Sequence, residues 1–82
     1  MPYPDKAQTE IAVVIGAGGF LGSHVADALS AAGFRVRLFD RQPSPYQRAD
    51  QEMIVGDLMD LNQVIQATQD ASIIYHFAAI AD

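Results

Sequence analysis

Apolar residues along the chain fall into four short segments, which are separated by longer amphipathic or polar stretches. The first segment is apolar from Ile11 to Ile15 without alternation, which is typical of a strand buried on both faces. The other three are also short and rich in β-branched or aromatic residues, which favour strands. The predicted strands are residues 10–15, 34–39, 53–55 and 72–77.

Two of the intervening stretches predict helices. In residues 20–32, apolar positions recur at helical spacing and form one stripe, with Gly33 as a C-terminal cap. The predicted stripe consists of Leu21, Val25, Ala28, Leu29 and Ala32.

The second helix is expected to begin after Asp60 and to end near Gln69 or Asp70. Asp60 is a suitable N-cap, and Gln63 completes a capping-box pattern. Its inward residues are predicted to be Leu61, Val64 and Ile65.

The stretch 41–52 is different, because Pro43 and Pro45 prevent a regular helix directly after the second strand. The resulting order is β-α-β-loop-β-α-β. It predicts an α/β fold: a partial, doubly wound Rossmann sheet of four parallel strands in the order 3-2-1-4, with helices on both faces. Residues 1–9 are predicted to be a polar lead-in, and residues 10–82 one half of a dinucleotide-binding domain.

Composition narrows the function classes. The chain has 82 residues, which allows one small domain, and its formal net charge of −5 argues against nucleic-acid binding. It has no cysteine, and His24 and His76 are not at metal-ligand spacing, so neither a thiolate nor a metal site is expected. No apolar run is long enough to cross a membrane, and no signal peptide is evident, so we expect a cytoplasmic protein.

The glycine-rich turn after the first strand carries the main chemical signal. Gly16, Gly19 and Gly22 lie between a buried strand and a helix. Glycines allow a tight turn and a close backbone approach, and the helix directs N–H groups and its dipole at an anion, so this context favours a pyrophosphate site. The spacing is G-x-x-G-x-x-G, because Leu21 stands where the commoner fingerprint has its third glycine.

Ligands of doubly wound sheets bind at the carboxyl ends of the strands. Asp40 ends the second strand, about 20 residues after the turn, where a carboxylate can accept both ribose hydroxyls and exclude a 2′-phosphate. NAD is therefore the favoured cofactor, with NADP as the alternative because Arg41 could pair with such a phosphate. Asp57 could accept from the adenine amine, with Leu58 on the ring, or could equally be a turn residue.

These residues together resemble the amino-terminal part of the extended short-chain dehydrogenase/reductases, the NAD-dependent epimerase/dehydratase group. The resemblance rests on the segments Gly16-Ala17-Gly18-Gly19-Phe20-Leu21-Gly22-Ser23-His24, Asp40-Arg41, Gly56-Asp57-Leu58 and His76-Phe77-Ala78-Ala79. Ile15 departs from the family, which usually has a threonine there.

The resemblance implies a role for each matching position. The pyrophosphate turn would be Gly16, Gly19, Phe20 and Leu21. Asp40 would bind the ribose beside Arg41, and Asp57 and Leu58 would contact the adenine. The small residues Ala78, Ala79 and Ala81 would form the wall under the middle of the cofactor.

Family members catalyse with a Tyr-x-x-x-Lys pair, and this sequence has none, because its three tyrosines are followed four residues later by Ala7, Asp50 and Ala79. We therefore expect no catalytic residue here and no turnover by the chain alone. The first hypothesis is the NAD-binding half-domain of a nucleotide-sugar epimerase/dehydratase-type oxidoreductase. The alternatives are a stand-alone NAD- or ADP-binding module and a chain that has lost the ligand and acts by association.

The fourth predicted strand, residues 72–77, would be an apolar sheet edge with unpaired backbone groups. We expect this edge to pair with a second copy of the chain.

Overall fold

The computed structural model describes residues 10–17 and 19–77. Its elements are β1 (Ile11–Ile15), α2 (Phe20–Ala31), β2 (Arg35–Asp40), β3 (Gln51–Val55), α3 (Leu61–Ala67) and β4 (Ala71–His76). All elements expected from the sequence are present. The largest boundary differences are β3, which begins two residues earlier than predicted, and the second helix, which ends at Ala67 rather than near Gln69.

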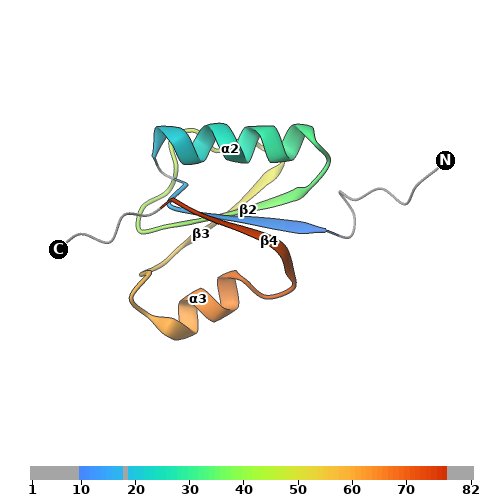
Figure 1. Cartoon of the computed structure of the whole chain (residues 1–82). Coiled ribbons are helices and arrows are strands. Elements are labelled where there is room, and N and C mark those ends of the chain that lie inside the picture. The colour runs from blue at the N-terminus through green and yellow to red at the C-terminus, as the bar shows by residue number, and fades with distance from the viewer. Residues whose placement is uncertain (1–9, 18, 78–82) are drawn as a thin grey trace.

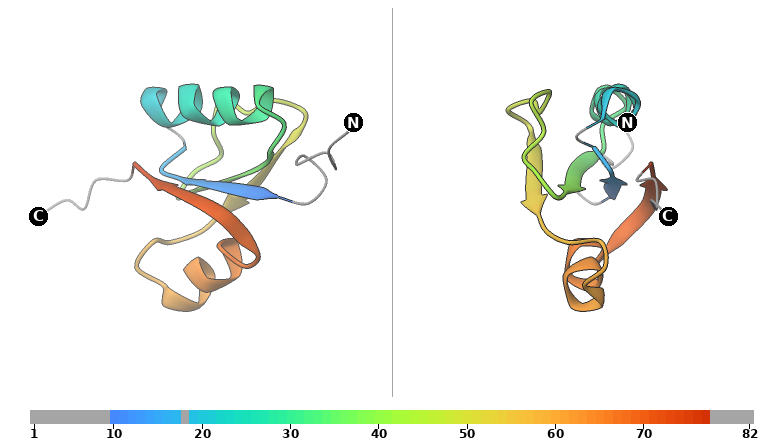
Figure 2. Two further views of the ribbon diagram at one scale, coloured as in Figure 1. Left: turned by 45° about the vertical axis from the view of Figure 1, so that its right-hand side comes forward. Right: turned by 90° about the vertical axis from the view of Figure 1, so that its left-hand side faces the viewer.

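The four strands form one parallel sheet in the order β3-β2-β1-β4, which confirms the predicted topology. Figure 1 shows α2 on one face of this sheet and α3 on the other. The end-on view in Figure 2 shows the same three layers, with the loop between β2 and β3 on the α2 side. The half-Rossmann arrangement follows from parallel strands joined by crossovers.

The central strand β1 supplies core residues to both faces. Ala12 and Val14 belong to the cluster under α2, whereas Val13 and Ile15 belong to the cluster under α3. Residues 12–14 are fully buried, which explains why this strand is continuously apolar in sequence. Each buried aliphatic side chain of this kind stabilises the fold by about 1.5–3 kcal/mol relative to an exposed one.

The predicted apolar stripe of α2 is partly wrong. Leu29 is buried and Val25 is partly buried, but Leu21 is 63% exposed and Ala28 and Ala32 are also exposed. The buried face consists instead of Gly22, Ser23, Ala26 and Leu29. Small residues occupy this face because the helix lies close to β1 and the turn that follows it.

The predicted inward face of α3 is also partly wrong. Val64 packs against the core, but Leu61 is 70% exposed and Ile65 is 48% exposed. Asp60 is the N-cap as predicted, because its side chain accepts from two backbone amides of the first turn. Gln63 does not close the expected reciprocal capping box, because its Oε1 accepts instead from the backbone N–H of Asp57 at 2.6 Å.

Candidate functional site

The carboxyl ends of the strands form a continuous row. The backbone N–H of Gly16 donates to the Phe39 carbonyl at 2.8 Å, and that of Gly56 donates to the Asp40 carbonyl at 2.9 Å. On the other side, the N–H of Phe77 donates to the Ile15 carbonyl at 2.7 Å. The sheet ladder therefore extends one residue beyond the strands and brings the glycine turn, Asp40 and the start of the Asp57 segment to one edge.

The turn after β1 has the backbone that a close anion approach requires. Gly16 has φ 86°, which an L-amino acid with a side chain rarely adopts. The N–H of Gly19 donates to the Gly16 carbonyl at 3.3 Å. Gly19 is also the N-cap of α2, and it provides no side-chain cap; the first helical turn carries no acidic residue. Within the described residues of this turn and helix start, no side-chain cap or first-turn acid compensates the positive end of the helix dipole, which can therefore attract an anion.

Gly22 has a packing role. A Cβ at this position would lie 2.7 Å from the Gly16 carbonyl oxygen and 3.1 Å from the Ala17 Cα. A Cβ at Gly19 would meet nothing nearer than 3.7 Å. Gly22 therefore allows α2 to pack directly against the turn. Gly19 instead leaves space at the surface of the turn.

Asp40 lies at the end of β2, beside the turn after β1. Its Oδ1 accepts the backbone N–H of Arg41 at 2.6 Å, which fixes the carboxylate near the edge of the sheet. Asp40 is partly buried, and Arg41 is exposed. A carboxylate here can accept hydrogen bonds from a vicinal diol bound along the edge.

Asp57 and Leu58 follow β3 on the same edge, with different environments. Asp57 is exposed, and its Oδ1 accepts the N–H of Met59 at 2.9 Å, so it also serves as a turn residue. Leu58 is partly buried and packs against the cluster under α3. The remaining predicted contacts, Ala78, Ala79 and Ala81, lie outside the described residues.

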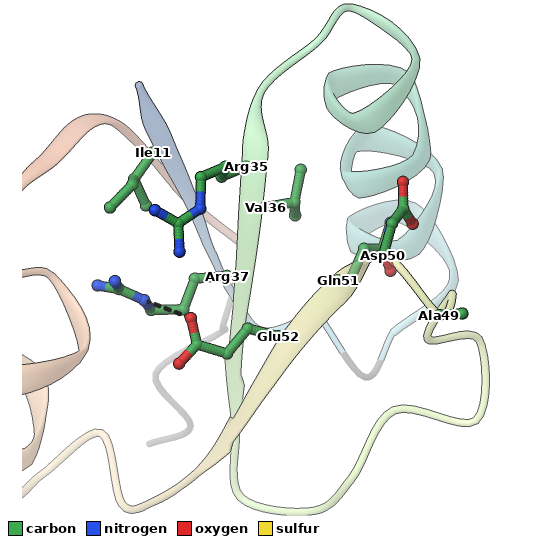
Figure 3. Close-up of a pocket in the computed structure, with 8 residues that line it drawn as sticks. All are labelled: Ile11, Arg35, Val36, Arg37, Ala49, Asp50, Gln51 and Glu52. Atoms are coloured by element: carbon green, nitrogen blue, oxygen red, sulfur yellow. Dashed lines mark hydrogen bonds and ion pairs between the residues drawn. The ribbon is translucent and has the colours of Figure 1, made fainter. Parts of the chain in front are cut away.

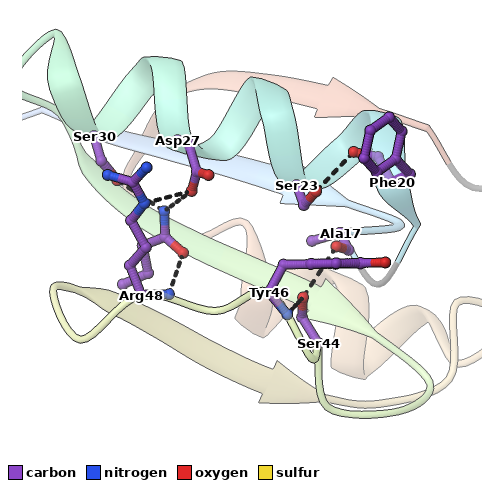
Figure 4. Close-up of polar contacts among 9 residues, drawn as sticks. Ala17, Phe20, Ser23, Asp27, Ser30, Ser44, Tyr46 and Arg48 are labelled. Carbon is purple, nitrogen blue, oxygen red and sulfur yellow. Dashed lines mark hydrogen bonds and ion pairs between the residues drawn. The ribbon is translucent and has the colours of Figure 1, made fainter.

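Ser44 and Tyr46, in the loop between β2 and β3, were not expected from the sequence to lie near the turn after β1. The Ser44 hydroxyl donates to the Ala17 carbonyl at 3.3 Å and accepts the Tyr46 N–H at 3.1 Å. Figure 4 shows the Tyr46 ring between Ser44 and Phe20, and the two ring centroids are 6.4 Å apart in an edge-on arrangement. The only sequence signal for this contact was a hydroxyl residue placed between two prolines.

A second set of polar contacts, centred on Gln51, links the end of the same loop to α2. The side chain of Gln51 is buried and donates to Asp27 Oδ1 at 3.2 Å and to Ser30 Oγ at 2.9 Å. Its Oε1 accepts the N–H of Arg48 at 2.9 Å, and the Arg48 guanidinium pairs with Asp27 at 3.1 Å (Figure 4). These bonds hold the loop along α2.

The structure also has a cavity of about 230 Å³ at the opposite, amino-terminal edge of the sheet (Figure 3). Its lining includes Ile11, Arg35 and Glu52. The Arg37 side chain on its wall is already engaged, because it pairs with Glu52 and donates to the carbonyls of Ala67 and Gln69. This cavity is separate from the turn and the Asp40 edge.

Two further expectations concern metal ions and membranes. Within residues 10–17 and 19–77, no group of three or more His, Cys, Asp or Glu side chains could hold a metal ion. His24 is exposed and lies edge-on to Phe20, with ring centroids 4.3 Å apart. No helix in the described part of the chain is long and apolar enough to span a bilayer.

Comparison with known proteins gives a consistent result. The model of the NAD dependent epimerase/dehydratase family matches residues 12–82. A 2-alkyl-3-oxoalkanoate reductase from Shewanella oneidensis is 40% identical over 76 residues, which are 92% of this chain and 20% of the reductase. The chain thus spans about a fifth of the length of the curated relatives it matches.

Solved structures of similar fold include proteins that hold NAD. A short-chain dehydrogenase/reductase superfamily protein from Agrobacterium tumefaciens, solved with bound NAD, matches with a TM-score of 0.76 and 32% identity over 89% of this chain and 21% of its own. MoeE5, solved in complex with UDP-glucose and NAD, matches with a TM-score of 0.72 and 35% identity over 87% of this chain and 23% of its own.

Proposed function

Because the chain belongs to the NAD-dependent epimerase/dehydratase family, we propose that it binds the adenosine diphosphate part of NAD at the carboxyl edge of its sheet. The diphosphate lies against the turn formed by Gly16 and Gly19 and the first helical residues, Phe20 and Leu21. Both of these side chains are well exposed, at 68% and 63%, so they are accessible to a ligand at the helix start.

The adenosine extends along the edge toward β3. Asp40 accepts the ribose hydroxyls, and Arg41 lies beside the adenine. Asp57 accepts from the adenine amine, while Leu58 contributes an apolar contact from its partly buried position. Ala78, Ala79 and Ala81 form the wall under the middle of the cofactor.

One observation carries this proposal. A helix start without side-chain caps follows a positive-φ glycine, and a carboxylate ends the adjacent strand at the same edge. An anion-binding helix start and a diol-binding carboxylate on neighbouring strands fit a nucleotide better than they fit a simple anion.

The reaction served by this cofactor is hydride transfer, because the relatives include a reductase and neighbours that hold NAD. The UDP-glucose in MoeE5 supports a nucleotide-sugar substrate for an oxidoreductase that contains this unit. Residues 1–82 contain no tyrosine followed four positions later by lysine. We therefore assign them cofactor binding, and expect no turnover by these residues alone.

Calorimetric titration with NAD and NADP tests the proposal. Wild type binds NAD, and Asp40→Ala weakens NAD binding by at least about tenfold, because hydrogen bonds to a charged group are lost. The same variant should reduce the ratio of NAD affinity to NADP affinity, because it lacks the negative charge that repels a 2′-phosphate. Asp50→Ala is the matched control, since Asp50 is an exposed carboxylate at the other edge of the sheet. Absence of wild-type binding at millimolar NAD refutes the proposal.

We also propose a second, compatible function, which is pairing of two copies through β4. Among the described residues β4 pairs with β1 alone. It contains no Asp, Glu, Lys or Arg that would oppose strand addition, and Ile74 and Tyr75 are exposed on it. Sedimentation equilibrium over micromolar concentrations should detect a dimer, and Ile74→Lys should shift it to monomer. A wild-type monomer throughout that range argues against the pairing.

A further inference from the structure

Ser44 joins the loop between β2 and β3 to the turn after β1. Its hydroxyl is a donor to the Ala17 carbonyl and an acceptor for the Tyr46 N–H, so both hydrogen-bonding functions of the group are used. The residue is 8% exposed, although it lies in a loop whose other residues, 41–43 and 45–50, are all exposed. Burial of one small polar side chain in an exposed loop indicates a specific contact.

The local sequence prepares Ser44 for this contact. Pro45 restricts the backbone of the preceding residue to extended conformations, and Pro43 fixes its own φ. The loop therefore loses little conformational entropy when the hydroxyl reaches Ala17. The polar group around Gln51 holds the other end of the loop against α2, so the contact is fixed from both sides.

We propose that Ser44 is a positioning residue for the diphosphate turn, an inference that rests on the proposed function. Ala17 lies within the turn and is completely buried. A carbonyl that is hydrogen-bonded to Ser44 is held toward the loop. A carbonyl oxygen released from that contact could rotate toward the ligand, where its partial negative charge would repel the phosphates. Ser44 therefore favours the turn conformation that accepts an anion.

The test compares Ser44→Ala with two controls by calorimetric titration with NAD, ADP and adenosine. Ser44→Ala should lower the affinity for NAD and for ADP by about fivefold, which corresponds to the loss of one neutral hydrogen bond. The affinity for adenosine should not change, because adenosine has no phosphate. Ser44→Thr keeps the hydroxyl and should restore affinity to within about twofold of wild type. Ser72→Ala, at an exposed serine of β4, should behave as wild type.

Thermal unfolding separates positioning from stability. Titrations are made well below the unfolding midpoint of every variant, where a loss of stability alone leaves the affinity of the folded protein unchanged. If Ser44→Ala does not fold, Ser44→Cys keeps the side-chain size with a much weaker hydrogen bond and should show the same loss. Equal NAD affinity in the serine and alanine or cysteine proteins overturns the inference, as does an equal loss for adenosine. Failure of wild type to bind NAD would instead refute the proposed function itself.

Discussion

Replacing Gly22 with alanine tests the close seating of α2 on the turn. Helix propensity alone predicts stabilisation by about 1 kcal/mol, because alanine is the best and glycine one of the poorest helix formers. The structure predicts the opposite result. The new Cβ would lie 2.7 Å from the Gly16 carbonyl oxygen, well inside the usual carbon–oxygen contact of about 3.3 Å. The two nearest atoms, the Gly16 carbonyl oxygen and the Ala17 Cα, belong to the backbone, so the clash can be relieved only if the helix moves.

Overpacking costs about 1–3 kcal/mol, and the upper part of that range, about 2–3 kcal/mol, applies here because only movement of the backbone relieves the contact. The propensity gain of about 1 kcal/mol is subtracted from this cost. We expect a net loss of about 1–2 kcal/mol. For a chain of this size, each kcal/mol corresponds to about 4–8 °C, so the unfolding midpoint should fall by about 5–15 °C. Circular dichroism at helical wavelengths, followed during heating, measures this change. NAD affinity should fall as well, because the shifted helix moves its first N–H groups away from the turn.

Gly19→Ala is the matched control. Its Cβ meets ordinary contact distances at 3.7 Å and its backbone φ is −81°, so stability should change by less than about 1 kcal/mol. NAD binding should nevertheless weaken, because the methyl group would occupy the surface proposed for the diphosphate. An unfolding midpoint for Gly22→Ala at or above that of wild type would refute the reasoning, since propensity would then outweigh the contact.

Two stability predictions concern α3. Asp60→Ala removes the cap that accepts two backbone amides, so the free energy of unfolding in urea should fall by about 1 kcal/mol, whereas Asp60→Asn should retain most of it; equal losses in both variants would contradict the capping role. Arg37→Met removes a guanidinium that donates to two carbonyls at the end of α3, at 2.8 and 3.0 Å, and should cost about 1–2 kcal/mol in the same assay. Arg35→Met, at an exposed arginine of the same strand, should change stability little, and a comparable loss there would show that the carbonyl contacts are not the cause.

The strand order and the residues at the carboxyl edge of the sheet were predictable because they depend on strong local signals. Continuous apolar runs such as Ile11–Ile15 mark strands buried on both faces, and helices between strands force parallel connections. Once the strands are parallel, the residue after each one must lie at the same edge. The positions of Gly16, Asp40 and Asp57 along that edge therefore followed from the chain order alone.

The buried face of α2 was not predictable from hydrophobicity. Its contact with the sheet uses Gly22, Ser23 and Ala26, which have little apolar surface, whereas the more hydrophobic Leu21 faces outward. Close helix–strand approach selects small residues, and this requirement has no hydrophobic signature. The prediction for α3 was wrong at Leu61 and Ile65 for a different reason. Periodicity identifies an apolar face, but it does not show which element covers that face.

The contact of Ser44 with Ala17 was also beyond the sequence. It joins residues 27 positions apart, and the loop that makes it has no periodic pattern. Prolines indicated where regular structure stops, but they did not show onto which element the loop would fold. Such a contact depends on the assembled sheet and helix, which place Ala17 within reach of the hydroxyl.

The extension of the sheet ladder past the strand ends has a practical consequence for cofactor engineering. Main-chain bonds from Gly16, Gly56 and Phe77 hold the row together, whereas the side chains at positions 40 and 57 accept hydrogen bonds from the backbone of the next one or two residues. Exchanging those side chains for neutral or basic ones should therefore retune nucleotide choice while the scaffold keeps its shape. Side chains at this edge can therefore be varied separately from the backbone that positions them.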